Sequence, residues 1–140
     1  MTLSVNQLTV GQQCKVVLVE DLTRTQIVQY AGASGDFNPL HTDEVFATEV
    51  AGYSSTFGHG MLTMALAGRM VTDFVGDGNL LKFGVRFRKP VWPGDRLRGT
   101  MTVDEVNVRS ATATATVSLS VVNERDELVI SGSATARIDR

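Results

Sequence analysis

GMLTMALAGRMVTDFV, residues 60–75, is a stretch with hardly any polar face. A helix that is apolar nearly all round is buried. Sixteen residues make about 24 Å of helix, which is enough to cross a small domain and too little to cross a bilayer. We therefore expect one long central helix over this range, ended by Gly76.

The sequence after this helix alternates between apolar and polar residues with period two, which is typical of strands that bury one face. The alternating segments are 83–88, 97–103, 111–122 and 130–138. Short loops separate them, around Pro93-Gly94-Asp95, Arg109-Ser110 and Asn123–Asp126, so we expect an antiparallel meander of four strands. The small inward residues that would let this sheet approach the helix are Gly99, Ala111, Ala113, Gly132 and Ala134.

The sequence before the central helix predicts one strand and two helices. Residues 14–20 (CKVVLVE) are mostly apolar and β-branched and predict the first strand. Thr23 and Gln26 have capping-box spacing and begin a helix that Gly35 ends. The inner face of this helix is expected to be Ile27, Tyr30, Ala31 and Ser34. The apolar side of a second, short helix over 42–50 is expected to be Val45, Phe46 and Val50.

A strand, helices and then a run of strands indicate an α+β fold in which the sheet curls around the central helix. The 140 residues, 43% hydrophobic and 20% charged, suit a single globular domain over 1–140. A net charge of -2 argues against a nucleic-acid-binding protein, which usually carries a basic surplus. The first residues show no signal-peptide pattern and no apolar run reaches about 18 residues, so we expect a cytoplasmic protein without a membrane span.

The stretch YAGASGDFNPLH, residues 30–41, carries an acid and an imidazole. On one continuous helix Asp36 and His41 would lie about 140° apart around the axis and could not act together. Pro39 disfavours helical geometry at Asn38, so the chain must bend between them. A bent loop can bring the carboxylate and the imidazole together, and such a pair moves protons near neutral pH.

The segment Phe57-Gly58-His59-Gly60 leads into the central helix. The first N–H groups of a helix have no partner within it and lie at the positive end of its dipole. Glycine at this point allows a ligand to approach the backbone, so the Gly60 N–H is a candidate donor to an oxyanion that develops on a carbonyl. His59 is expected to orient the start of the helix and is a candidate substrate-binding residue.

YAGASGDFNPLH followed by HGMLTMA resembles the hydratase 2 signature of the MaoC-like dehydratase family, (R)-specific enoyl-thioester hydratases with a hot dog fold. The likeness covers nearly the whole chain and extends to the catalytic B subunits of actinobacterial type II (3R)-hydroxyacyl-acyl-carrier-protein dehydratases. The resemblance implies that Asp36 and His41 form the catalytic dyad. It also implies that Asn38 holds the loop around them and that the Gly60 N–H donates to the oxyanion.

The reaction implied by the resemblance is the reversible syn addition of water across a trans-2-enoyl thioester, which gives the (3R)-hydroxyacyl thioester. Asp36 and His41 would hold the water, one taking its proton while hydroxyl adds at C3 and the other delivering a proton at C2. The Gly60 N–H would polarise the thioester carbonyl. The residues leave open which of the two is the base, the acyl chain length, the carrier (CoA or acyl carrier protein) and the physiological direction.

Two features lie outside this motif. Some family members place a serine about two turns into the central helix, where this chain has Gly68, which either removes a second donor to the carbonyl or widens the acyl tunnel. The other feature is a local charge of +5, from Asp95 and the cations Lys82, Arg86, Arg88, Lys89, Arg96 and Arg98. Arg86 and Arg88 are either a solvated strand face or a binding site for CoA phosphates or an acidic carrier protein.

Two rival functions follow from the same fold. A hot dog acyl-thioesterase typically needs a carboxylate on the central helix, but residues 61–72 contain no Asp or Glu. A non-catalytic acyl-binding subunit would have no use for Asp36 and His41 on a strained loop.

The partners expected from the sequence are a thioester substrate and a second hot dog subunit. A single domain of this kind leaves a sheet edge uncovered, so we expect either a homodimer or a heterodimer with a sister subunit. No metal is expected, because the sequence shows no cluster of His, Cys, Asp and Glu at ligand spacing beyond the dyad. No cofactor is expected either, because no glycine-rich phosphate-binding motif is present.

Overall fold

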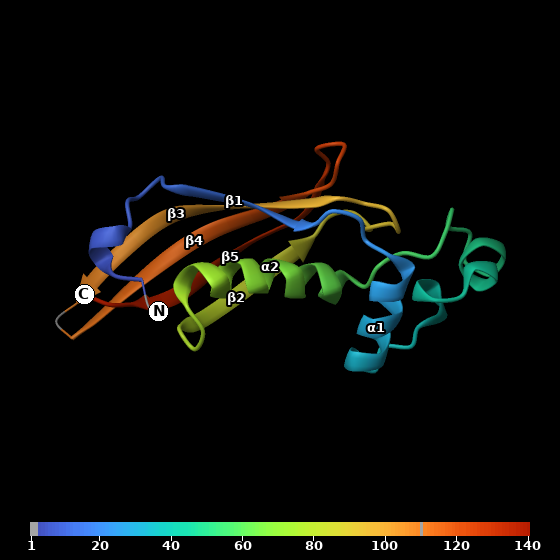
Figure 1. The fold of residues 1–140 in the computed structure, drawn as a ribbon, viewed down its shortest axis with the longest axis horizontal. Helices are drawn as coiled ribbons and strands as arrows, with labels where there is room; N and C mark the ends of the chain where they lie inside the picture. Colours follow the sequence, from blue (N-terminus) through green and yellow to red (C-terminus); the bar gives the residue numbers. More distant parts are fainter. Residues whose placement is uncertain (1–2, 110) are drawn as a thin grey trace.

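The computed structural model describes residues 3–109 and 111–140, in which one long helix lies along a curved sheet (Figure 1). The strands are β1 (Gln13–Val19), β2 (Leu80–Phe87), β3 (Leu97–Arg109), β4 (Thr112–Val122) and β5 (Leu128–Ile138). The helices are α1 (Arg24–Ser34) and α2 (Gly60–Val75), with short helical turns at Val5–Gln7, Pro39–His41 and Phe46–Val50. The expected α+β hot dog architecture is confirmed. The predicted turn at Arg109-Ser110 includes Ser110, which lies outside the described residues.

Helix α2 has the predicted bounds and is ended by Gly76, which has a φ of 88°. Ala67, Met70, Val71 and Val75 belong to the main core. Gly99 of β3 lies directly against the helix, because a Cβ there would come within 2.5 Å of Met70 Sδ. Met61 and Arg69 are exposed on the opposite face, so a single chain buries only one side of the helix. Among the described residues, no helix is both long and apolar enough to cross a lipid bilayer.

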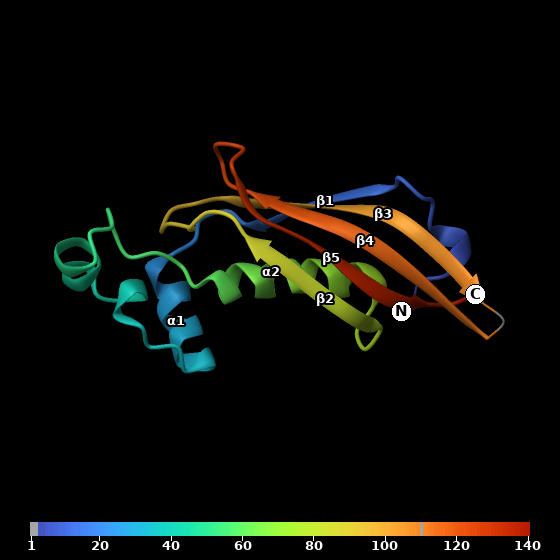
Figure 2. The same ribbon diagram turned by 180° about the vertical axis from the view of Figure 1, so that it is seen from behind.

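The five strands are all antiparallel and lie in the order β1-β3-β4-β5-β2. The predicted meander is therefore correct for β3, β4 and β5 but wrong for β2, which pairs with β5 at the sheet edge (Figure 2). The chain after β2 crosses the end of the sheet instead of turning back. Its Arg88 N–H donates to the carbonyl of Val129, and its Gly94 N–H to the carbonyl of Leu22, beyond β1. Pro90 and Pro93 in this crossing cannot donate to a ladder.

Three of the five small residues expected beneath the helix have other roles. A Cβ on Gly132 would meet the Gly84 carbonyl oxygen at 2.1 Å, so this glycine permits close approach of β2, not of α2. Ala113 packs in a second, smaller cluster with Ile138. Ala111 is exposed and precedes β4. Period two identifies a face of a strand, but it does not say what covers that face.

Helix α1 begins as predicted, since Thr23 Oγ1 accepts from the Gln26 N–H and Gly35 ends the helix in a left-handed conformation. Ile27 and Ala31 are buried, whereas Tyr30 is half-buried and Ser34 is exposed. The second short helix differs from its prediction. Asp43 Oδ1 accepts from the Phe46 N–H. The turn over Phe46–Val50 is π-helical, and its buried residue is Ala47. The predicted inner residues Val45 and Val50 are exposed.

Candidate active site

The loop after α1 is held by its own side chains. The Asp36 N–H donates to Ser34 Oγ at 3.2 Å, and the Asn38 N–H donates to Asp36 Oδ1 at 3.2 Å. Asn38 Oδ1 in turn accepts from the Leu40 N–H at 3.0 Å and caps the turn that Pro39 begins. Asn38 therefore acts within the loop, fixing the bend that separates the acid from the imidazole.

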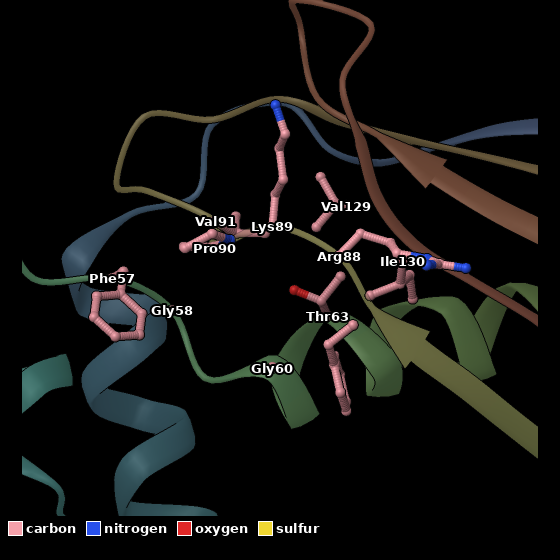
Figure 3. A pocket seen from close by; sticks show the side chains of 11 residues that line it. Phe57, Gly58, Gly60, Thr63, Arg88, Lys89, Pro90, Val91, Val129 and Ile130 are labelled. Carbon is pink, nitrogen blue, oxygen red and sulfur yellow. The ribbon is translucent and has the colours of Figure 1, made fainter.

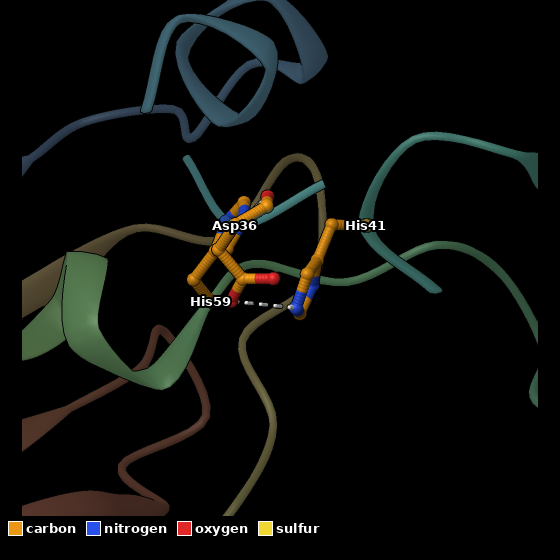
Figure 4. A group of neighbouring side chains, drawn as sticks. All are labelled: Asp36, His41 and His59. Atoms are coloured by element: carbon orange, nitrogen blue, oxygen red, sulfur yellow. Dashed lines mark hydrogen bonds and ion pairs between the residues drawn. The ribbon is translucent and has the colours of Figure 1, made fainter. Parts of the chain in front are cut away.

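Asp36 and His41 face each other across this bend. His41 Nε2 lies 4.0 Å from Asp36 Oδ2, the contact dashed in Figure 4. His41 Nδ1 lies 2.7 Å from the carbonyl oxygen of Phe57. Because a carbonyl only accepts, Nδ1 carries the proton, and in the neutral ring Nε2 is a free acceptor. Two acceptors 4.0 Å apart form no hydrogen bond directly, but one water between them can donate to both.

His59 joins the loop to the start of α2. Its side chain is 2% exposed, and its Nε2 lies 3.0 Å from the carbonyl oxygen of Asp36. The ring stacks on His41 with a centroid separation of 3.8 Å and meets Tyr30 edge-on at 5.0 Å. Because a carbonyl only accepts, Nε2 carries a proton, and Nδ1 has no hydrogen-bond partner among the described residues. His59 lies behind the dyad and holds the loop as well as the helix start.

Gly60 is the first residue of α2, directly after His59. Within the described residues, its N–H and that of Met61 donate to no protein acceptor. A Cβ on Gly60 would lie 3.0 Å from the ring of Phe87, so the glycine allows this ring to pack against the helix start. The free N–H groups remain available to an anion or a polarised carbonyl.

A cavity of about 270 Å³ opens beside the helix start, between α2 and the chain that follows β2 (Figure 3). Its walls include Phe57, Gly60, Thr63, Phe87, Val91 and Ile130. Neither Asp36 nor His41 lines it, but Phe57 connects the two, since its carbonyl accepts from His41 and its ring meets that imidazole edge-on at 5.3 Å. Phe57 thus contacts the dyad and lines the cavity.

The three side chains Asp36, His41 and His59 hold potential metal-ligand atoms within 4.8 Å of one another, which corrects the expectation of a dyad alone. The sequence did not reveal this cluster because His59 is distant along the chain. However, the two imidazole planes are inclined by only 26° at a centroid separation of 3.8 Å. The lone pairs of the ring nitrogens lie in these planes, so the two rings cannot both direct a lone pair at one metal ion from the distance of about 2 Å that a metal–imidazole bond needs. The cluster is better suited to proton transfer.

The predicted basic stretch divides into paired and unpaired cations. Lys89, Arg96 and Arg98 form ion pairs with Glu127, Glu20 and Asp126. Lys82, Arg86 and Arg88 form none within residues 3–109 and 111–140, and they line a groove of about 590 Å³ on the outer face of β2 and β5. Arg88 also lines the cavity beside Gly60, whereas Arg86 does not.

Gly68 packs against β2. A Cβ there would lie 3.1 Å from the ring of Phe83, so the glycine allows this ring to approach α2 closely. Both alternatives at this position, a lost second donor and a wider acyl tunnel, stay predictions. Two further residues of the site were not identified from the sequence: Thr63, which lies within the apolar run 60–75, and Phe87, which lies in the alternating segment 83–88.

The comparisons with known proteins agree with this architecture. A model of the MaoC-like domain matches residues 5–125. The (R)-specific enoyl-CoA hydratase of Aeromonas caviae is 29% identical over 138 residues, 97% of this chain and 99% of that protein. The 3-hydroxyacyl-thioester dehydratase Y of Mycobacterium tuberculosis is 45% identical over 67 residues, 46% of this chain but only 23% of that protein. The structure of the unliganded R-hydratase PhaJ1 from Pseudomonas aeruginosa superposes with a TM-score of 0.85 at 26% identity, covering 99% of this chain and 87% of that one.

The matched region contains both motifs of the site, the loop with Asp36 and His41 and the start of α2 at Gly60. It stops before β5, but the superposition on the R-hydratase extends the likeness across nearly the whole chain. Sequence, fold and site geometry agree, and the chain belongs to the MaoC-like dehydratase family.

Proposed function

We propose that the protein catalyses the reversible hydration of trans-2-enoyl thioesters and the dehydration of (3R)-hydroxyacyl thioesters in fatty-acid metabolism. The observation that carries this proposal is the 4.0 Å separation of Asp36 Oδ2 and His41 Nε2, with the His41 Nδ1 proton committed to the Phe57 carbonyl. This arrangement leaves two proton acceptors facing one water-sized space. The relatives named as hydratases and dehydratases support the same reaction class.

In the hydration direction, a water held by Asp36 and His41 attacks C3 of the enoyl thioester. One of the two groups takes the water proton as the C3–O bond forms, and a proton is delivered to C2 on the same side, so that one water is consumed. Negative charge passes through the thioester oxygen as an enolate, and the Gly60 N–H stabilises it. Dehydration follows the same steps in reverse.

The carrier of the acyl group is expected to meet the protein at Arg88. CoA and the prosthetic arm of a carrier protein both carry phosphate at the end opposite the thioester, and guanidinium groups bind phosphate well. Arg88 borders both the outer basic groove and the cavity beside Gly60, so a phosphate there would direct a thioester toward the helix start. Arg86 contributes charge from the outer face.

The thioesterase alternative finds little support in the geometry. The acidic residue on α2 is Asp73, which is exposed and forms an ion pair with Arg69 at 3.7 Å. It lies in the last turn of the helix, far along the chain from the start at Gly60. The non-catalytic alternative does not account for the paired Asp36 and His41.

A second subunit would complete the molecule. β1 and β2 are sheet edges, and an exposed stripe of α2 includes Met61 and Arg69. Such surfaces favour pairing of two hot dog domains, either identical or sister subunits. The single domain over 1–140 and the cytoplasmic location stay predictions of the sequence.

The test follows the absorbance of the conjugated enoyl thioester with crotonyl-CoA and a longer homologue. Wild type is expected to turn over at least one of them, and Asp36→Asn to lower kcat by about 10³-fold. Asp73→Asn is the matched control, because it removes an exposed carboxylate of α2 and is expected to retain full activity. Absence of turnover on any enoyl or 3-hydroxyacyl thioester, alone or with candidate partner subunits, would dismiss the proposal.

A further inference from the structure

Thr63 is a buried polar residue in the first turn of α2 whose hydroxyl has no hydrogen-bond partner in the part of the chain that the structure describes. Its exposure is 3%, and none of the described residues forms a hydrogen bond with its Oγ1. Figure 3 shows this oxygen directed into the cavity beside Gly60. Around it the cavity wall is largely apolar, including Val91, Val129 and Ile130.

The Thr63 hydroxyl is reached from the cavity, because among the described residues the one fully buried side-chain polar atom without a partner is His59 Nδ1. A helical threonine often donates instead to a carbonyl one turn back, as Thr72 does to the Arg69 carbonyl at 3.2 Å on the same helix. Thr63 forms no such bond, so its hydroxyl is free to donate to a molecule in the cavity.

Gly60 and Thr63 are three residues apart and therefore share one face of α2. Both line the same cavity, and the Gly60 N–H also lacks a protein acceptor. Two unused donors, one from the backbone and one from a hydroxyl, thus flank one space. This is what a carbonyl oxygen with two acceptor lone pairs requires.

We infer that the Thr63 hydroxyl is a second donor to the thioester carbonyl oxygen, acting together with the Gly60 N–H. The inference rests on the proposed function. Thr63 transfers no proton and forms no covalent bond: it donates one hydrogen bond to an oxygen that gains negative charge as the enolate forms. The bond is therefore stronger in the transition state than in the bound substrate, and its loss lowers kcat more than it raises KM.

The test compares Thr63→Val, which keeps the shape but removes the hydroxyl, with Thr63→Ser, which keeps the hydroxyl. Thr63→Val is expected to lower kcat on crotonyl-CoA on the order of 100-fold, as loss of one oxyanion donor does, with KM changed less than about threefold. Thr63→Ser is expected to stay within about fivefold of wild type. Thr72→Val, on the same helix but outside the cavity, is the matched control and is expected to leave kcat unchanged.

Thermal unfolding separates this role from a structural one. Because the hydroxyl has no partner among the described residues, Thr63→Val is expected to have a melting temperature equal to or above that of wild type. An active wild type with an equally active Thr63→Val variant would overturn the inference and leave the proposed function standing. A loss of activity that follows a fall in melting temperature would also overturn it. An inactive wild type would refute the proposed function itself.

Discussion

The imidazole of His59 stacks on that of His41, with ring centroids 3.8 Å apart and planes inclined by 26°. The same ring lies 3.0 Å, through Nε2, from the carbonyl oxygen of Asp36. One buried side chain at the start of α2 therefore contacts both members of the dyad. It fixes the position of the acid and the imidazole relative to the N–H groups of the helix start.

His59→Phe tests this positioning role. The phenyl ring can still stack on His41, but it cannot donate to the Asp36 carbonyl. We expect kcat on crotonyl-CoA to fall about fivefold, the loss expected for one hydrogen bond of about 1 kcal/mol, with KM unchanged because His59 does not line the cavity. Tyr30→Phe keeps the ring that meets His59 edge-on and serves as the control.

A substrate-binding role for His59, the expectation from the sequence, would give a different result. In that case KM would rise and kcat would change little. Wild-type kcat in His59→Phe would show that the link to Asp36 has no catalytic consequence.

Phe87 offers a test of acyl selectivity. Its ring packs against Gly60 and lines the cavity, although the side chain is 53% exposed. Phe87→Ala is expected to enlarge the cavity and to raise kcat/KM for a longer enoyl-CoA relative to crotonyl-CoA several-fold, since each buried methylene contributes about 0.8 kcal/mol. Leu81→Ala removes an equally exposed apolar side chain from the same strand outside the cavity. An unchanged ratio in Phe87→Ala would place the acyl chain elsewhere.

The features that the sequence predicts well are local ones. The bounds of α2 follow from an apolar run between His59 and Gly76, and those of α1 from the Thr23 cap and Gly35. The bend between Asp36 and His41 follows from Pro39, whose restriction acts on its immediate neighbour.

The features that the sequence misses depend on tertiary contacts. Period two does not encode which strand pairs with which, so the position of β2 beside β5 was not predicted. His59 contacts Asp36, 23 residues earlier, through a ring nitrogen and a carbonyl that no spacing rule connects. Thr63 is significant only because its hydroxyl lacks a partner among residues 3–109 and 111–140, which is a property of the packed structure.

Charge reversal can distinguish the contributions of Arg88 and Arg86 to substrate binding. Arg88→Glu is expected to raise KM for an enoyl-CoA about tenfold at low salt and less at high salt, because screening weakens attraction to phosphate. Arg86→Glu is expected to have a smaller effect, since Arg86 lines the outer groove but not the cavity. Lys15→Glu changes an exposed cation on β1 and controls for net charge. A KM that is independent of both substitutions at every ionic strength would identify the basic face as solvated surface.

Glu127 lies where the turn after β4 meets the chain that crosses the sheet end. Its carboxylate forms an ion pair with Lys89 and accepts from Arg125 Nε at 2.7 Å and Asn123 Nδ2 at 3.1 Å. These donors, with Lys89 foremost, lower the pKa of Glu127 from 4.5 to about 2. Lys89 also lines the cavity, so this ion pair helps to hold one cavity wall.

The lowered pKa predicts how stability depends on pH. A carboxyl group whose pKa is lower in the folded state stabilises the fold above its unfolded pKa, here 4.5, and this contribution is lost as pH falls from there through about 2. Glu127→Gln is therefore expected to have a lower melting temperature than wild type at pH 7 and the same one near pH 2. Glu49→Gln, at an exposed carboxylate without an ion pair among the described residues, is the control. Melting curves of Glu127→Gln and wild type that keep a constant separation across this range would contradict the assignment, because only a contribution carried by the ionised carboxylate disappears on protonation.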